Sequence, residues 1–166
     1  MLSMTAKELD DLWDTRCCLE ALAARVACQY VTDKDISHLL KLCDLRDAAA
    51  LEKSGEAVGR FEIEYHQQII RLSRNRILRD VFESRKLLEI SCSPGVGALQ
   101  MADADSTSPY GHRSIVNAIA QRNENLADEL MTRHLRAAKT RAMHQVRQRS
   151  ANGAVFSRDA QRRRSF

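Results

Sequence analysis

Glu62 and His66 are two metal-ligating residue types placed four positions apart on a predicted helix. They belong to the segment RFEIEYHQQIIRLSRN, residues 60–75, whose helical spacing puts both on one face, with apolar residues one turn further along. Burying a carboxylate and an imidazole costs free energy unless both groups find polar partners. The spacing therefore predicts a functional pair inside the fold, which other residues must complete.

Two further histidines fall on apolar helix faces. His112 begins one helical segment and His134 lies within another. The apolar residues that define these faces are Ile115, Val116 and Ile119 for His112, and Leu126, Leu130 and Met131 for His134. Three imidazoles and one carboxylate from three helices make a complete ligand set for a divalent transition metal such as Zn, Ni, Fe or Cu. The alternative is that each histidine is a core residue bonded to a neighbour.

The composition is that of one soluble helical domain. The chain has 166 residues, 44% of them apolar and 29% charged, with only two prolines and six glycines. A chain of this length can bury a core without disulfides. No apolar run approaches the length of a membrane span, and the acidic N-terminal segment MLSMTAKELDDLWD does not have the pattern of a secretory signal. We therefore expect a cytoplasmic protein with no membrane partner.

Helices are expected over most of the chain. Thr5 and Glu8 have the spacing of a capping box at the start of the first helix, and Thr32 or Asp33 is the expected N-cap of the second. The expected helices cover about residues 5–30, 34–53, 58–73, 77–91, 112–123 and 124–149. Residues 92–111 hold both prolines and half of the glycines, which predicts a long irregular connection. About six helices with otherwise short links predict an all-α antiparallel bundle.

Basic residues are concentrated at the C-terminal end. Residues 133–166 hold ten Lys/Arg and one acidic residue, a balance of +9, whereas the preceding residues hold 16 basic and 21 acidic residues, a balance of −5. No aromatic or glycine pattern interleaves the terminal arginines, so we expect a solvated end and not a nucleic-acid contact. The predicted organisation is a helical domain over residues 1–150 and a basic, disordered tail over residues 151–166.

The cysteines show no spacing typical of a thiolate metal site or of a disulfide framework. The five cysteines are Cys17, Cys18, Cys28, Cys43 and Cys92. We predict that they are reduced and packed as small buried hydrophobic residues. The remaining histidines, His38 and His144, are predicted to lie on the surface, outside the metal centre.

Three segments of the chain together resemble the FCD domain, the all-helical effector-binding half of FadR-type regulators in the GntR family. The segments are TRCCLEALAARVACQYVTDKDISHL, EIEYHQQIIRLSRN and HRSIVNAIAQRNENLADELMTRHL, and the likeness spans about residues 8–140. The resemblance implies that Glu62, His66, His112 and His134 bind a divalent metal, with Zn²⁺ expected and Ni, Fe or Mn as alternatives. Glu62 stands where the family usually has Asp, and Tyr65 where it usually has Phe.

The same resemblance implies partners for this domain. A small organic acid is the expected effector, completing the coordination of the metal, with Arg16 and Asn75 as effector contacts. The structural alternatives are a surface ion pair of Arg16 with Glu20, and a helix-terminal turn at Asn75. A homodimer is implied, and DNA binding only through a winged helix-turn-helix domain, which is absent from this chain.

Two other functions fit the same residues, although no enzyme activity is expected. An open position on a histidine-rich metal can activate water, so a metal-dependent hydrolase is one alternative. No motif places a second carboxylate or base as its proton acceptor. The other alternative is a structural helical interaction module in which the histidines only pack.

Overall fold

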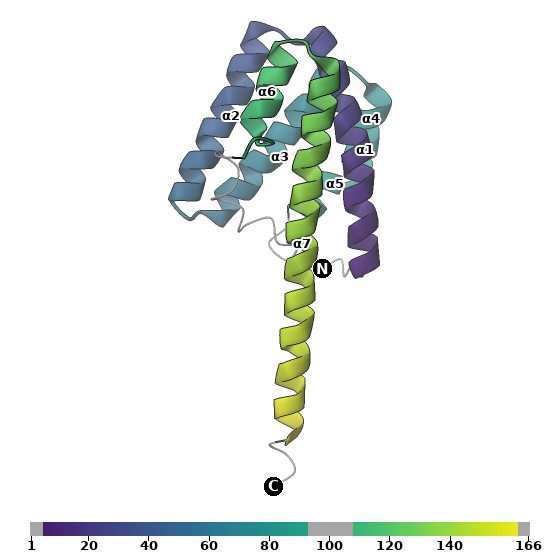
Figure 1. The fold of residues 1–166 in the computed structure, drawn as a ribbon, viewed down its shortest axis with the longest axis vertical. Helices are drawn as coiled ribbons and strands as arrows, with labels where there is room; N and C mark the ends of the chain where they lie inside the picture. Colours follow the sequence, from purple (N-terminus) through teal and green to yellow (C-terminus); the bar gives the residue numbers. More distant parts are fainter. Residues whose placement is uncertain (1–4, 93–107, 163–166) are drawn as a thin grey trace.

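The described part of the chain is helical throughout, apart from its turns (Figure 1). A computed structural model describes residues 5–92 and 108–162, with side chains described up to residue 148. The helices are α1 (Ala6–Tyr30), α2 (Asp33–Leu51), α3 (Gly55–Leu72), α4 (Arg76–Arg85), α5 (Leu87–Ser91), α6 (His112–Ala120) and α7 (Glu124–Arg162). The predicted all-α class is confirmed. The irregular connection predicted over residues 92–111 lies mostly outside the described residues.

Polar side chains cap the start of α1, α2 and α4. Thr5 forms the predicted capping box with Glu8 at the start of α1, and Thr32 caps α2. The helix predicted over residues 77–91 is two helices, because Lys86 adopts a left-handed conformation (φ 49°) that ends α4 and precedes α5. The described residues therefore form seven helices, where the sequence predicts about six.

The helices pack around a shared interior bounded by α1, α3, α6 and α7. In Figure 1, α1 and α7 run antiparallel and side by side, and these two helices share the most extensive packing. Residues Ala23, Ala24 and Ala27 of α1 are fully buried, which is consistent with a close approach of neighbouring helices. Helix α3 contacts α1 and α2, and α6 contacts α7 and α2. One face each of α3, α6 and α7 is thereby directed toward the same interior.

Helix α7 is far longer than its neighbours and extends beyond the bundle (Figure 1). Its first half packs against the other helices, and its buried residues are Ala127, Met131, His134, Leu135, Ala138 and Ala142. The helix continues to Arg162, so residues 151–162 of the predicted basic tail are helical. The domain division at residue 150 stays a prediction.

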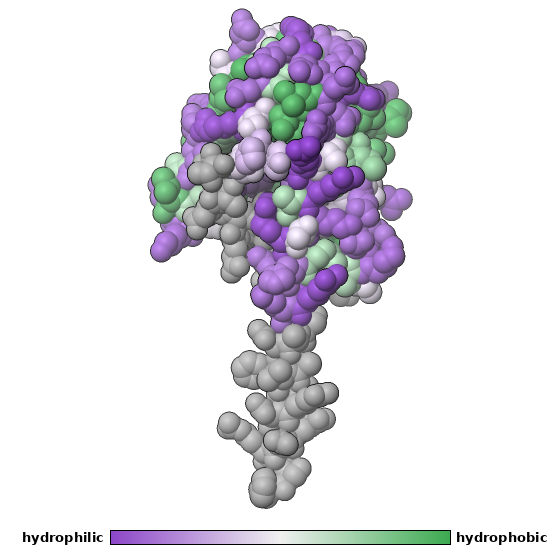
Figure 2. Space-filling view, viewed as in Figure 1, coloured by the Kyte–Doolittle hydropathy of each residue, from purple (hydrophilic) through white to green (hydrophobic). Residues whose placement is uncertain are grey.

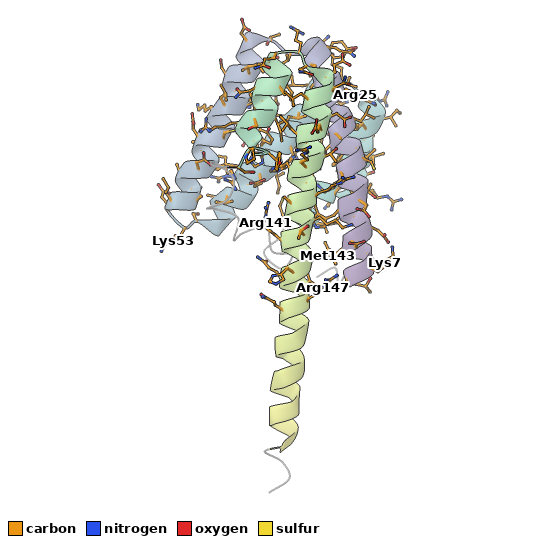
Figure 3. The ribbon with its side chains drawn as sticks, in the orientation of Figure 1. Lys7, Arg25, Lys53, Arg141, Met143 and Arg147 are labelled. Atoms are coloured by element: carbon orange, nitrogen blue, oxygen red, sulfur yellow. The ribbon has the colours of Figure 1, made fainter. Side chains whose placement is uncertain are left out.

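The surface is mainly hydrophilic on the face drawn in Figure 2, where hydrophobic residues are scattered among polar ones. Long charged side chains such as Lys7, Arg25 and Lys53 are exposed and point away from the bundle (Figure 3). None of the helices within the described ranges is both long and apolar enough to cross a membrane.

Burial confirms most of the predictions for cysteine and the outlying histidines. His38 and His144 are exposed, as predicted. Of the five free cysteines, four are buried and Cys18 is exposed, so the prediction of a buried residue is wrong at Cys18. Cys18 lies on the outer face of α1, next in sequence to the buried Cys17, and one position along a helix turns a side chain by about 100°.

Candidate metal centre

Glu62, His66, His112 and His134 meet in the interior of the bundle. Helix α3 supplies Glu62 and His66 one turn apart, His112 is the first residue of α6, and His134 lies in α7. One ligand atom from each residue can be chosen so that all four lie within 4.8 Å of one another. All four side chains are buried, with at most 6% of any residue exposed.

The imidazole rings surround the carboxylate of Glu62. The ring centroids of His112 and His134 are 4.4 Å apart, and that of His66 lies 5.5 Å from His112 and 5.6 Å from His134. The Nε2 atoms of His66 and His112 lie 3.7 and 3.2 Å from the same oxygen, Oε2 of Glu62. The donor atoms of α3 and α6 therefore converge on one point.

The second oxygen of Glu62 is held from the side of α2. The Arg46 guanidinium donates through Nε to Oε1 of Glu62 at 2.6 Å, and both side chains are buried. Burial alone would raise the pKa of Glu62, but His112, His66 and Arg46 beside it hold that pKa well below its usual range. Glu62 is thus an ionised carboxylate, with one oxygen fixed by Arg46 and the other facing the histidines.

His66 is held from the opposite side by Glu20 of α1. Its Nδ1 lies 2.5 Å from Oε2 of Glu20, while Oε1 of Glu20 accepts from Nε of Arg16 at 2.6 Å. The guanidinium of Arg16 also donates to the Ser91 hydroxyl at 2.6 Å and lies over the ring of Trp13. Burial favours the neutral acid, but Arg16 and His66 outweigh it and lower the pKa of Glu20 to about 2.

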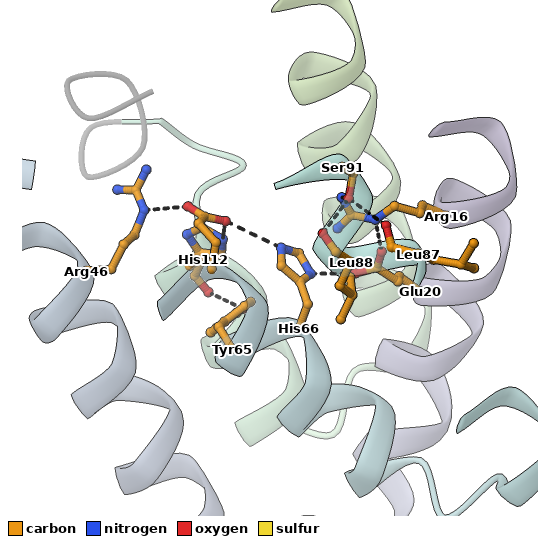
Figure 4. A network of polar contacts seen from close by, with 10 residues as sticks. Arg16, Glu20, Arg46, Tyr65, His66, Leu87, Leu88, Ser91 and His112 are labelled. Carbon is orange, nitrogen blue, oxygen red and sulfur yellow. Dashed lines mark hydrogen bonds and ion pairs between the residues drawn. The ribbon is translucent and has the colours of Figure 1, made fainter. Parts of the chain in front are cut away.

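A continuous line of polar contacts results, running through the interior of the bundle (Figure 4). It passes from Arg46 through Glu62 to the histidines, and then from His66 through Glu20 and Arg16 to Ser91. Five helices besides α7 contribute to it: α1, α2, α3, α5 and, through His112, α6. Glu62 is therefore held by Arg46 and His66 by Glu20, and neither Arg46 nor Glu20 is a proposed ligand.

Tyr65 positions the start of α6. Its hydroxyl donates to the backbone carbonyl of His112 at 2.9 Å, and its ring meets the His112 ring edge-on at a centroid distance of 4.3 Å. Phenylalanine, the residue expected here from the family resemblance, would provide the ring contact without the hydrogen bond.

The donor set fits a divalent transition metal. Three imidazole nitrogens and one carboxylate oxygen suit Zn, Ni or Fe, and bonds to such donors are about 2.0–2.2 Å long. The four donor atoms lie within 4.8 Å of one another, which is close enough for them to gather around one ion.

A shallow gap adjoins the centre between α2, α3 and α6. It is lined by Leu42, Cys43, Arg46, Phe61, Glu62, Tyr65 and His112, and these side chains pack too closely to leave room for a water molecule. Typical small-molecule pockets have volumes of about 300–1,000 Å³. A ligand could enter from this side of the centre only if these side chains moved apart.

The predicted effector contacts, Arg16 and Asn75, both have structural partners. Arg16 is 1% exposed and pairs with Glu20 as the i,i+4 spacing predicts, but the pair is buried and not on the surface. Asn75 is the N-cap of α4, and its side-chain oxygen accepts from the backbone N–H of Leu78. Their role as effector contacts stays a prediction.

Sequence reasoning missed Arg46 and gave Glu20 no place in the centre. Glu20 did carry a signal, because it shares a helix face with Trp13, Cys17 and Ala24, all of them buried. A charged pair at i,i+4 within such an apolar stripe indicates a buried pair, not a surface one. Arg46 carried no comparable signal, since its partner Glu62 comes from another helix.

Comparison with known proteins agrees with this architecture. The chain is similar to Streptococcus agalactiae GntR, with a TM-score of 0.65 and 21% sequence identity over 84% of this chain and 62% of that one. It is also similar to E. coli McbR/YncC, with a TM-score of 0.63 and 19% identity over 83% of this chain and 71% of that one. The chain thus spans less than two thirds of the length of the S. agalactiae protein. No curated protein matches it significantly by sequence.

The sequence model of the FCD domain family matches residues 11–137, which is most of the chain. This range contains all four residues of the candidate metal centre, together with the whole of α3 and α6. The chain belongs to the FCD domain family.

Proposed function

We propose that this domain senses a small organic acid for a GntR/FadR-type transcriptional regulator, through a divalent metal held by Glu62, His66, His112 and His134. The observation that carries the proposal is the convergence of these four buried donors from three helices. Imidazole and carboxylate donors make Zn²⁺ the expected ion, with Ni, Fe or Mn as alternatives. Four protein ligands leave one or two positions for a ligand on a five- or six-coordinate ion.

The charge balance of the site supports an anionic ligand. The buried line of contacts carries two carboxylates, Glu20 and Glu62, and two guanidiniums, Arg16 and Arg46. These four charges cancel, so a divalent ion would add two positive charges that nothing in this line neutralises. Uncompensated charge is costly in a buried site. A carboxylate on an open coordination position would offset part of that cost.

Arg16 and Asn75 remain the proposed protein contacts of the acid. Arg16 already bonds Glu20 and Ser91, so an effector would share its guanidinium with them. The side-chain oxygen of Asn75 caps α4, which makes its amide nitrogen the atom to offer to a carboxylate.

The remaining parts of the proposal concern the assembly. We propose a homodimer in the cytoplasm, in which effector binding shifts the packing of the helices between two states. DNA binding would belong to a winged-helix domain and not to the described helices. The FCD family membership supports the regulatory role.

The hydrolase alternative requires a proton acceptor beside an open metal position. Glu20 is the second buried carboxylate near the centre, and it contacts Nδ1 of His66, whereas Nε2 of the same ring faces Glu62. Glu20 thus lies on the far side of the His66 ring from the point where the donors converge. This placement favours binding over water activation.

The test combines metal analysis with ligand binding. Purified protein should contain one divalent ion per chain by elemental analysis, and native mass spectrometry should report the ion, any retained acid and the subunit count. Adding small mono-, di- and tricarboxylic acids should raise the melting temperature of metal-loaded protein, but not of chelator-treated protein. Absence of stoichiometric metal after reconstitution would overturn the proposed metal site. Acid binding that is equally strong with and without metal would overturn the proposed sensing mechanism.

A further inference from the structure

We infer that Glu20 is a positioning residue that fixes the tautomer of His66, so that Nε2 of His66 presents a lone pair to the metal position. The inference rests on the proposed function in that it concerns the same metal centre. It starts from one contact: Oε2 of Glu20 lies 2.5 Å from Nδ1 of His66, and both side chains are at most 2% exposed.

The chemistry of the two groups decides where the proton lies. An ionised carboxylate can only accept hydrogen bonds, and the buried pair that Glu20 forms with the Arg16 guanidinium at 2.6 Å favours the ionised form of Glu20. A neutral imidazole beside it must therefore carry its proton on Nδ1 and donate it to Glu20. The other nitrogen, Nε2, is then an acceptor, and it is the atom directed at Oε2 of Glu62. Carboxylate-to-histidine contacts of this kind fix the ring orientation and raise the basicity of a metal-ligating histidine.

Glu20 is itself fixed by Arg16, which determines how it can be replaced. The two oxygens of Glu20 face different groups: Oε1 accepts from Arg16, and Oε2 lies 2.5 Å from Nδ1 of His66. Glutamine offers one oxygen and one NH₂ group, so its oxygen can accept from only one of these groups. If its oxygen stays with Arg16, its NH₂ donates to Nδ1 of His66 and moves the imidazole proton to Nε2. A protonated Nε2 has no lone pair for a metal ion.

The first arm of the test reads the tautomer directly. Metal-free wild-type protein, labelled with ¹⁵N at histidine, should show His66 as the Nδ1–H tautomer in long-range ¹H–¹⁵N spectra at neutral to mildly alkaline pH. Glu20→Gln should convert His66 wholly or partly to the Nε2–H form. A wild-type His66 that already carries its proton on Nε2 would overturn the inference, even if every variant failed to fold.

The second arm measures affinity for Zn²⁺ and Co²⁺ alone by competition with a chromophoric chelator. Loss of such a neighbouring contact typically weakens metal binding about 10–100-fold, which is the loss expected for Glu20→Gln. Glu20→Asp keeps a carboxylate and should recover part of the affinity. Asp14→Asn is the matched control, because Asp14 lies on α1 and pairs with Lys139 on the surface, away from the histidines.

The outcomes separate this inference from the proposed function. Wild-type protein that binds no metal, with His66 still in the Nδ1–H form, would defeat the proposed metal site and leave the role of Glu20 in fixing the tautomer supported. Wild-type protein that binds metal tightly, with Glu20→Gln matching Asp14→Asn in affinity and in the Co²⁺ absorption spectrum, would overturn the positioning role alone.

Discussion

Tyr65 and His112 are joined by two contacts, a hydroxyl-to-carbonyl hydrogen bond of 2.9 Å and an edge-on ring contact with a centroid distance of 4.3 Å. The pair ties α3 to the first turn of α6, where His112 enters the candidate metal centre. Since Tyr65 precedes His66 in sequence, one turn of α3 both supplies one proposed ligand and anchors another.

Tyr65→Phe should keep the fold and lose one buried hydrogen bond. We expect the free energy of unfolding of metal-free protein to fall by about 1 kcal/mol, the usual net value of such a bond. Urea denaturation measures this change. The matched control is Tyr110→Phe, which removes a more exposed hydroxyl that accepts from Arg133. Equal effects of both substitutions would contradict a special role for Tyr65.

Metal should stabilise the protein through His134. Zn²⁺ at about 100 times its dissociation constant should add about 2.7 kcal/mol to the stability of wild-type protein, because the ion binds only the folded state. His134→Ala should abolish most of this gain in a thermal melt with and without metal. His144→Ala, an exposed histidine on the same helix, should retain it in full. If His134→Ala is stabilised by Zn²⁺ as much as the wild-type protein, the ion binds at another site.

Arg46→Leu should destabilise the metal-free protein strongly. It leaves the buried carboxylate of Glu62 without its cation, and breaking a buried pair in this way typically costs about 3–5 kcal/mol. A bound divalent ion would replace the lost positive charge, so we expect Arg46→Leu to lower the free energy of unfolding less when metal is added. Denaturant titrations of both forms measure the difference.

Arg113→Leu serves as the control for that experiment. Arg113 pairs with Asp44 and Asp47 at the surface, where its side chain is 42% exposed, and such pairs contribute about 0–1 kcal/mol. If Arg46→Leu lowers the free energy of unfolding by the same amount with and without metal, Arg46 does not act through the charge of Glu62.

Acidification should remove the stabilising contribution of Glu20. Its pKa is lowered from 4.5 to about 2 in the folded protein, so its carboxylate contributes stability above about pH 4.5 and loses it as the pH falls toward 2. The stability difference between metal-free wild-type protein and Glu20→Gln should therefore narrow across that interval. Urea midpoints at several acidic pH values measure it, and a constant difference would contradict the ionised state of Glu20.

The fold and the helix faces that carry the four proposed ligands were predictable because they depend on local sequence patterns. Capping boxes at Thr5 and Thr32 and apolar spacing determine where α1 and α2 begin, and both are visible in a single sequence. Glu62 and His66 are four apart on one helix, so their common face needs no tertiary information. The break at Lys86 was not predictable in this way, because a left-handed lysine carries no composition signal.

The residues that hold the ligands in place were less accessible to sequence reasoning. Arg46 and Glu62 are sixteen positions apart on different helices, and nothing in their types indicates that they pair. The spacing of Arg16 and Glu20 is typical of exposed and buried pairs alike, and only the apolar residues on the same face of α1 indicate that this pair is buried. The contacts that shape the centre are thus mainly properties of the tertiary structure.

The length of α7 has a mechanical consequence. From His134 to Arg162 the helix runs for 28 residues, which at 1.5 Å per residue is about 42 Å. A tilt of about 5° around the metal centre would displace the far end of such a straight helix by about 4 Å, since the displacement grows with distance from the pivot. A small tilt of α7 at His134 would therefore be amplified toward the end of the helix that projects beyond the bundle.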